Sequence, residues 1–279
     1  MKDPQREGQA TRRHIRLPGA SNLRDLGGYP GHGNRTVRWG SLFRSGAMPK
    51  LAEADWQWML AQGVATVCDL RSPQERELAP TVWQGPPRTR HIHADYDAAL
   101  IFERPLAALR PDAPLNDMHH SLYPLFVDIL VPALREMFEA LLAGQVPLIV
   151  HCSAGQDRTG LAAGLLLAAL GVDRDTILED YLLSTECRQF ENELDRMGLA
   201  AFAEANLVAR FYTKAISERG IDAVKPRRLV DPQGNALLAA ALEAIEARWG
   251  SIEAYLRDRL GVGPLEIDRL RSLYLEPAG

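Results

Sequence analysis

The sequence predicts an α/β fold in which a central, mostly parallel sheet is flanked by helices, with extra helices toward the C-terminus. Short segments with strand character, at residues 64–70, 90–94 and 146–150, alternate with helical patterns at residues 52–62 and 157–170. Such alternation is typical of a parallel sheet with crossover helices. The rest of the chain is mainly helical in pattern, which predicts the additional helices.

The spacing of apolar residues and the position of a glycine indicate the first helix and the strand after it. Residues 52–62 carry apolar side chains at helical spacing, such as Trp56 and Met59, and Gly63 follows as a C-cap. Residues 64–70 form a short apolar run directly after this glycine. A run of this length, bounded by turn residues, favours a buried strand.

The remaining elements are expected from weaker patterns. A strand is expected at residues 36–43, and residues 98–120 are expected to form loop and short helix. A helix at residues 122–143 should break near Pro132, because proline lacks the N–H that a helix interior needs. Further helices are expected at about 174–187, 188–217, 234–248, 251–259 and 265–274.

The chain is predicted to form one domain, residues 15–279, preceded by a flexible polar arm at residues 1–14. Hydrophobic residues make up 46% and charged residues 24%, as in ordinary globular proteins, and the formal net charge is −4. The absence of a basic excess argues against nucleic acid and anionic membranes as partners.

The amino-acid sequence also predicts where the protein is located. Residues 1–16 lack an apolar signal segment, and the most apolar stretch, residues 161–172, is too short to span a bilayer. Three cysteines, Cys68, Cys152 and Cys187, do not form a disulfide framework. We therefore expect a cytoplasmic protein without stable membrane association.

The segment that carries chemistry is residues 151–160, His-Cys-Ser-Ala-Gly-Gln-Asp-Arg-Thr-Gly. It lies between a buried strand and an apolar helix, and a helix N-terminus offers unpaired N–H groups and positive potential. The small residues Ser153, Ala154 and Gly155 allow successive N–H groups to surround an anion. The loop therefore predicts an anion site of phosphate size.

Two residues of the loop indicate a reaction and not binding alone. The same positive potential favours the thiolate of Cys152, which makes this cysteine a candidate nucleophile. Arg158 offers a planar fork of donors that matches two phosphate oxygens. Thr159 follows, where its hydroxyl is able to donate a hydrogen bond to the cysteine sulfur. The candidate phosphate-binding residues are Ser153, Ala154, Gly155, Gln156 and Thr159.

The loop resembles that of the protein tyrosine phosphatase superfamily, with cysteine, five residues, arginine and then Thr-Gly. Asp157 directly before Arg158 is similar to the bacterial tyrosine/dual-specificity branch, related to mycobacterial secreted and cyanobacterial enzymes. Residues 22–29 (Asn-Leu-Arg-Asp-Leu-Gly-Gly-Tyr), 42–45, 68–72 and 250–256 also resemble this branch. The resemblance covers roughly residues 15–275.

The resemblance implies a tyrosine phosphatase-like fold and hydrolysis of phosphotyrosine, with phosphoserine and phosphothreonine as further substrates. The reaction would pass through a phosphocysteine on Cys152, release inorganic phosphate and need no metal or cofactor. Phosphorylated proteins or small aryl phosphates are the expected partners. Members of this branch usually carry a lysine, linked with phosphoinositide hydrolysis, where this chain has Gln156. We therefore expect phosphotyrosine and other aryl phosphates to be preferred over phosphoinositides.

The general acid is open between two positions. The branch is thought to use the loop aspartate, here Asp157, but an aspartate at a helix N-terminus is also stabilised there without any catalytic role. Related phosphatases place the acid on a loop upstream of the cysteine, where Asp97, or less favourably Asp95, is available. We favour Asp157.

Other polar residues have structural explanations at least as good as functional ones. Arg24, Arg44, Asp69 and Arg71 are expected to form ion pairs that orient loops, Arg24 with Asp25 and Arg71 with Asp69, and direct phosphate contact is the alternative. His151 is expected to orient the cysteine. His91, His93, His119 and His120 show no metal-ligand spacing. Cys68 is a core cysteine or a redox partner of Cys152.

Two competing functions use a similar loop. A phosphate-binding pseudophosphatase would not need the nucleophile Cys152, and a sulfur transferase would not need the Arg-Thr-Gly that follows it. A para-nitrophenyl phosphate assay and a thiosulfate assay distinguish these functions. A mobile lid is expected over the site, formed by residues 98–125 or by residues 185–217.

Overall fold

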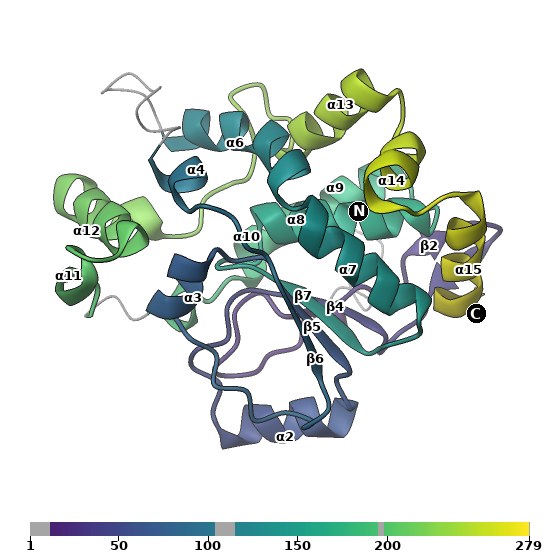
Figure 1. Cartoon of the computed structure of the whole chain (residues 1–279), viewed down its shortest axis with the longest axis horizontal. Coiled ribbons are helices and arrows are strands. Elements are labelled where there is room, and N and C mark those ends of the chain that lie inside the picture. The colour runs from purple at the N-terminus through teal and green to yellow at the C-terminus, as the bar shows by residue number, and fades with distance from the viewer. Residues whose placement is uncertain (1–11, 104–114, 195–197, 279) are drawn as a thin grey trace, which may run out of the picture.

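A five-stranded sheet forms the centre of the protein (Figure 1). The structure is a computed structural model, and it describes residues 12–103, 115–194 and 198–278. The strand order is β1-β4-β7-β5-β6, where β1 is antiparallel to β4 and every other neighbour is parallel. This confirms the predicted mostly parallel sheet. The strands are β1 (Arg24–Asp25), β4 (Leu42–Ser45), β7 (Leu148–His151), β5 (Thr66–Asp69) and β6 (Arg90–His93).

The register brings the ends of four strands to one edge of the sheet. Ser45 pairs with His151, His151 with Asp69, and Asp69 with His93. All four residues are the last of their strands. Because ligands of open parallel sheets bind beyond the carboxyl ends of the strands, this edge is where a site is expected.

The two faces of the sheet are covered by different numbers of helices (Figure 1). On one face, α2 (Glu53–Gln62) packs Trp56 and Met59 against Phe43, Val67 and Ile149 of the strands. The other face is covered by the larger core, to which α7 (Val131–Leu142) and α8 (Asp157–Ala169) belong. Alternate residues along β4, β5 and β7 supply the two cores, as the pleat of a strand requires.

The C-terminal helices pack around the larger core. They are α13 (Leu238–Trp249), α14 (Ile252–Leu260) and α15 (Pro264–Tyr274), which contact α6 (Leu115–Ile129), α7 and α8. The chain then forms β8 (Leu275–Pro277), which pairs with β3 (Arg35–Val37) beside β2 (Pro30–Gly31) in a small antiparallel sheet. This second sheet was not predicted, because three-residue strands carry too little pattern.

Several predicted elements are confirmed with small shifts in their ends. The break near Pro132 is found, since α6 ends at Ile129 and α7 begins at Val131 with the proline in its first turn. The segment 174–187 forms two helices, α9 (Arg174–Leu182) and α10 (Ser184–Cys187). Residues 98–120 contain α4 (Ala99–Phe102) and the start of α6, and their middle, 104–114, lies outside the described residues.

Two predictions of secondary structure were wrong. The strand expected at residues 36–43 is divided between β3 and β4, because the chain turns at Gly40, whose φ is +72°. The helix expected at residues 188–217 is interrupted, because Asn206 caps a new helix by accepting from the N–H groups of Val208 and Ala209. The elements there are η1 (Phe190–Asn192), α11 (Leu199–Phe202), α12 (Leu207–Arg219) and η2 (Ile221–Val224).

In addition, the structure contains α3 (Pro73–Leu78), a helix that was not predicted. Ser72 caps it, and Glu75 reaches back to the N–H of Ser72, which completes a capping box.

Of the predicted arm, residues 1–14, the structure describes only residues 12–14, and residues 1–11 lie outside the described part. Within residues 12–14, Arg13 is buried and donates to the carbonyl of Gly27 over 2.6 Å. None of the helices in the described ranges is both long enough and apolar enough to cross a membrane.

Candidate active site

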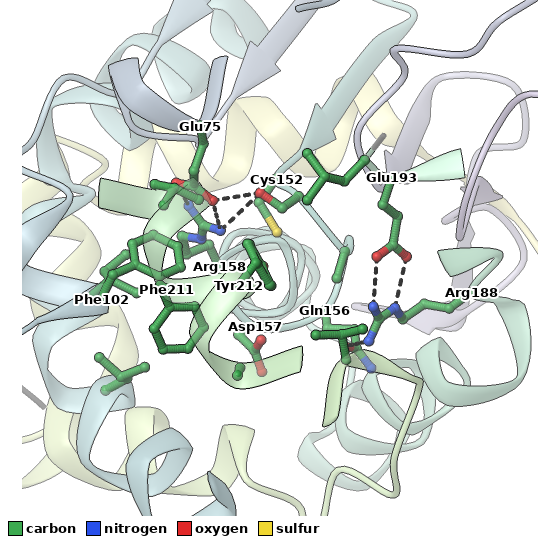
Figure 2. A pocket seen from close by; sticks show the side chains of 18 of the residues that line it. Glu75, Phe102, Cys152, Gln156, Asp157, Arg158, Arg188, Glu193, Phe211 and Tyr212 are labelled. Carbon is green, nitrogen blue, oxygen red and sulfur yellow. Dashed lines mark hydrogen bonds and ion pairs between the residues drawn. The ribbon is translucent and has the colours of Figure 1, made fainter. Parts of the chain in front are cut away.

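The loop between β7 and α8 lies at the edge where the parallel strands end. Cys152 follows the last residue of β7, and Asp157 begins α8. Cys152 is only 2% exposed, yet it lines a pocket together with Ser153, Asp157 and Arg158. Figure 2 shows Cys152, Asp157 and Arg158 close together in this pocket. The structure therefore brings the predicted nucleophile, clamp and loop aspartate together.

The carbonyl groups of the loop are held by partners from other segments. The carbonyl of Ser153 accepts from the N–H of Ala47 over 2.8 Å. Asn22 donates to the carbonyls of Ala154 and Gly155, over 3.1 and 2.8 Å. In a planar trans peptide the N–H of the next residue points away from the carbonyl. The following N–H groups are therefore directed to the other side of the loop, which suits the predicted anion cradle.

Gly155 is required by both conformation and space. Its φ is +66°, a left-handed value that other residues adopt only with strain. A Cβ at this position would lie 2.5 Å from the carbonyl oxygen of Ser45. The loop therefore lies directly against the end of β4.

Buried arginines fix the loop from below. Arg44 of β4 donates to the carbonyl of Gly155 over 2.8 Å and is paired with Asp180 of α9. Arg24 pairs with the same carboxylate, so the predicted Arg24–Asp25 pair was wrong. Burial alone would raise the pKa of Asp180, but Arg24 and Arg44 lower it to about 2. Both guanidinium groups are thus held by the charge of Asp180, and Arg44 in turn supports the loop.

Arg158 is oriented by a carboxylate that sequence reasoning missed. Its Nη1 and Nη2 atoms each lie 2.7 Å from an oxygen of Glu75 in α3. Nη1 also donates to the hydroxyl of Tyr96 over 2.6 Å, and Ser153 donates its hydroxyl to Glu75 over 2.5 Å. Burial would raise the pKa of Glu75, but the Arg158 charge lowers it below its usual value. The spacing of Ser72 and Glu75, typical of a capping box, was the signal available in the sequence.

The two candidate acids lie in different surroundings. Asp157 lines the pocket, and its Oδ1 atom accepts a hydrogen bond from the hydroxyl of Tyr123. Asp97 is exposed, and its carboxylate accepts from the N–H of Ala99 over 2.9 Å at the start of α4. Asp95 is also exposed. Among the pocket-lining residues, Asp157 is present and neither Asp95 nor Asp97 is.

A model of the tyrosine phosphatase family matches residues 15–276 of this sequence. The chain belongs to the tyrosine phosphatase family. It is 34% identical over 264 residues to a putative tyrosine-protein phosphatase of Cupriavidus necator, covering 91% of this chain and 86% of that protein. It is 29% identical over 289 residues to the triple specificity protein phosphatase PtpB of Mycobacterium tuberculosis, covering 93% of this chain and 98% of that protein.

A tyrosine-protein phosphatase of Nostoc commune is 25% identical over 234 residues, which cover 83% of this chain and 73% of that protein. These matches confirm the resemblance seen in the sequence. The protein is accordingly an enzyme, a cysteine-dependent phosphatase of the kind that works through a phosphocysteine intermediate.

Gln156 of this phosphatase is bonded to a cation from another segment. Arg188, which follows α10, donates from Nη1 to the side-chain oxygen of Gln156 over 2.6 Å. The same guanidinium forms a two-point pair with Glu193, over 2.6 and 2.8 Å. Burial would lower the pKa of Arg188, but Glu193 raises it, so Arg188 stays charged. Sequence reasoning did not identify Arg188 or Glu193, because neither lies in a recognisable motif.

Thr159 and His151 flank the core of the loop. The Thr159 hydroxyl is buried and has no hydrogen-bond partner within the described residues, so the expected bond to the cysteine sulfur is not formed in this structure. His151 is buried, with Nε2 at 3.7 Å from Asp69, and burial lowers its pKa to about 4. His151 is therefore neutral at pH 7, which is compatible with the expected role of orienting the cysteine by hydrogen bonds. Asp69 pairs with Arg71 over 2.7 Å, as expected.

His91, His93 and Cys68 are not among the described residues that line this pocket. Across the described ranges, no group of three or more potential metal ligands is present. The side chains of His119 and His120 lie outside the described residues. Burial raises the pKa of the Cys68 thiol, which keeps it protonated.

The walls of the pocket come from both segments that were considered for a lid. Phe102 of α4, Phe126 of α6, and Phe211 and Tyr212 of α12 all line the pocket. Phe102 and Phe211 lie next to each other in Figure 2. Phe102 and Phe211 contact each other edge to face, with ring centroids 5.2 Å apart. Lys225, Arg227 and Arg228 also line the pocket. The opening is thus apolar and aromatic in its walls, with added cations.

Proposed function

We propose that this phosphatase hydrolyses phosphotyrosine in proteins and small aryl phosphates, with Cys152 as nucleophile, Arg158 and the loop N–H groups as phosphate ligands, and Asp157 as general acid. The main support for this proposal is that Cys152, Asp157 and Arg158 line one pocket at the sheet edge where the parallel strands end. The phosphoryl oxygens would be bound by the loop 153–157 and by the Nε side of Arg158, since Nη1 and Nη2 are bonded to Glu75.

The chemistry proceeds in two displacements. The Cys152 thiolate attacks phosphorus while Asp157 gives its proton to the leaving phenolate oxygen. In the second step the Asp157 carboxylate takes a proton from water, and this water attacks the phosphocysteine and releases inorganic phosphate. The unpartnered hydroxyl of Thr159 is available to stabilise the departing thiolate.

The shape of the pocket supports an aryl substrate. Cys152 is 2% exposed and lies below aromatic walls that include Phe102, Phe211 and Tyr212. A phosphotyrosine side chain is long enough to reach a recessed sulfur, and its ring gains contact with aromatic neighbours. Phosphoserine and phosphothreonine are shorter, so we place them as secondary substrates.

Phosphoinositides are proposed as poor substrates, although the mycobacterial relative is named for triple specificity. Gln156 adds no charge to the cradle, and Arg188, the cation bonded to Gln156, is already neutralised by Glu193. A highly charged head group gains less there than it would from a free lysine.

The test is a substrate panel on the wild type and on Cys152→Ser. We expect phosphotyrosine peptides to be hydrolysed fastest, phosphoserine peptides and phosphoinositides at least tenfold more slowly, and Cys152→Ser to be inactive on all. Phosphoinositide turnover equal to phosphotyrosine turnover contradicts the proposed preference, and activity retained in Cys152→Ser contradicts the proposed nucleophile.

We propose a cytoplasmic location for this phosphatase, which the three free cysteines support.

A further inference from the structure

A buried chain of two tyrosine hydroxyls leads to Asp157 from behind the pocket. Tyr123 of α6 donates its hydroxyl to Oδ1 of Asp157, and a second hydrogen bond joins the hydroxyls of Tyr123 and Tyr181 of α9. Both tyrosines are 0% exposed. Helices from distant parts of the sequence therefore meet at the first residue of α8.

The direction of donation in this chain is fixed. A phenol has one hydroxyl hydrogen. Because Tyr123 uses its hydrogen on Asp157, the second bond must run from the Tyr181 hydroxyl to the Tyr123 oxygen. Burial, and after it the Asp157 charge, raise the pKa of both tyrosines well above the usual value, so both remain protonated.

This arrangement distinguishes the two oxygens of Asp157. Oδ1 accepts a hydrogen from a phenol that keeps its proton, whereas Oδ2 has no partner among the residues that the structure describes. A general acid needs its transferable proton on the oxygen that is free to meet the leaving group. With Oδ1 occupied as an acceptor, that proton belongs on Oδ2.

We infer that Tyr123, held in place by Tyr181, is a positioning residue that fixes the rotamer of Asp157 and keeps its transferable proton on Oδ2. The inference rests on the proposed role of Asp157 as general acid. Neither tyrosine lines the pocket, so both would act through the aspartate and not on the substrate.

Gly160 supports the inference independently. A Cβ on this residue would lie 2.8 Å from Cδ2 and 3.2 Å from Cε2 of Tyr181. The Tyr181 ring is therefore packed directly on the first turn of α8. In this chain the glycine after Thr159 leaves the space that the Tyr181 ring occupies.

The experiment compares leaving groups. Phosphotyrosine and phenyl phosphate release phenols that ionise near pH 10, so they depend on the acid, whereas para-nitrophenyl phosphate releases a far more stable anion. For Tyr123→Phe we expect kcat/KM to fall about tenfold on the first two substrates and less than about twofold on the third, a part of the roughly 10²–10⁴ that a general acid contributes. Tyr181→Phe should change kcat/KM in the same direction.

Tyr255→Phe is the matched control. Tyr255 is also 0% exposed, and its hydroxyl donates to the carbonyl of Val127 in α6 over 2.7 Å. This variant also loses one buried hydroxyl bond, but none to Asp157. It should show no dependence on the leaving group beyond that of the wild type. If Tyr123→Phe does not fold, Tyr181→Phe carries the test.

Asp157→Asn separates the two levels of the proposal. A steep dependence on the leaving group in Asp157→Asn, with no further loss in the double variant Tyr123→Phe/Asp157→Asn, supports action through the aspartate. The inference is overturned if Asp157→Asn shows this dependence while Tyr123→Phe loses activity equally on all substrates or on none. If Asp157→Asn itself shows no such dependence, the general acid proposed above is wrong, and the role of Tyr123 is rejected with it.

Discussion

Glu75→Gln is the substitution that tests most directly how Arg158, the proposed phosphate ligand, is held. Glu75 is 3% exposed and accepts from both terminal nitrogens of Arg158, from the Ser153 hydroxyl and from the N–H of Ser72. Glutamine keeps the size of the side chain but removes its negative charge. Arg158, whose side chain is 9% exposed, is then a buried cation without a counter-charge.

The expected loss of stability follows from that burial. Removing one partner of a buried ion pair costs about 3–5 kcal/mol, since the remaining charge is left uncompensated. For a chain of this size the melting temperature should fall by about 10 °C. Because the guanidinium is no longer fixed against the loop, kcat/KM on phosphotyrosine should fall about 10²-fold.

Urea unfolding at pH 7 measures the first effect and steady-state kinetics the second. Asp258→Asn is the control, since Asp258 is paired with Arg257 over 2.7 Å on the exposed surface and its loss should not change the unfolding midpoint measurably. An unfolding free energy of Glu75→Gln within about 1 kcal/mol of the wild type would refute the claim that Glu75 and Arg158 form one buried unit.

Three further outcomes are expected. The pKa of His151 is lowered from 6.5 to about 4 in the folded protein, so the unfolded chain binds this proton more readily. The free energy of unfolding should therefore fall by about 2–3 kcal/mol between pH 6.5 and pH 4. His151→Asn should remove this decrease when urea unfolding is measured as a function of pH. Gly155→Ala should lower kcat/KM about 10²-fold, because its Cβ would displace the loop from Ser45; near-normal kinetics contradict this. Gln156→Lys should raise phosphoinositide hydrolysis about tenfold in a phosphate-release assay by adding a charge near the cradle; unchanged turnover contradicts that reasoning.

The parts of the site that sequence predicted are those encoded within one segment. The loop from Cys152 to Thr159 follows a buried strand and opens an apolar helix, so its position at the sheet edge could be deduced from local pattern. The Asp69–Arg71 pair was also predicted, because its partners are two residues apart.

The parts that sequence did not predict depend on pairing between distant segments. Asp180 neutralises Arg24 and Arg44 from α9, and Glu75 orients Arg158 from a short helix that was itself missed. No local signal tells which of many carboxylates meets a given arginine once the chain is folded. The interruption before α12 was missed for another reason, since a cap at Asn206 outweighed a sequence of good helix formers.

The pairing of β8 with β3 has a consequence for synthesis. Leu275 pairs with Val37, so β3 waits during synthesis for a strand that lies far later in the sequence. Until then one edge of β3 is unpaired, and an unpaired strand edge promotes aggregation with other chains. Since domains fold as the ribosome releases them, we expect this corner to close last, and nascent chains of this protein to depend on chaperones that shield such edges.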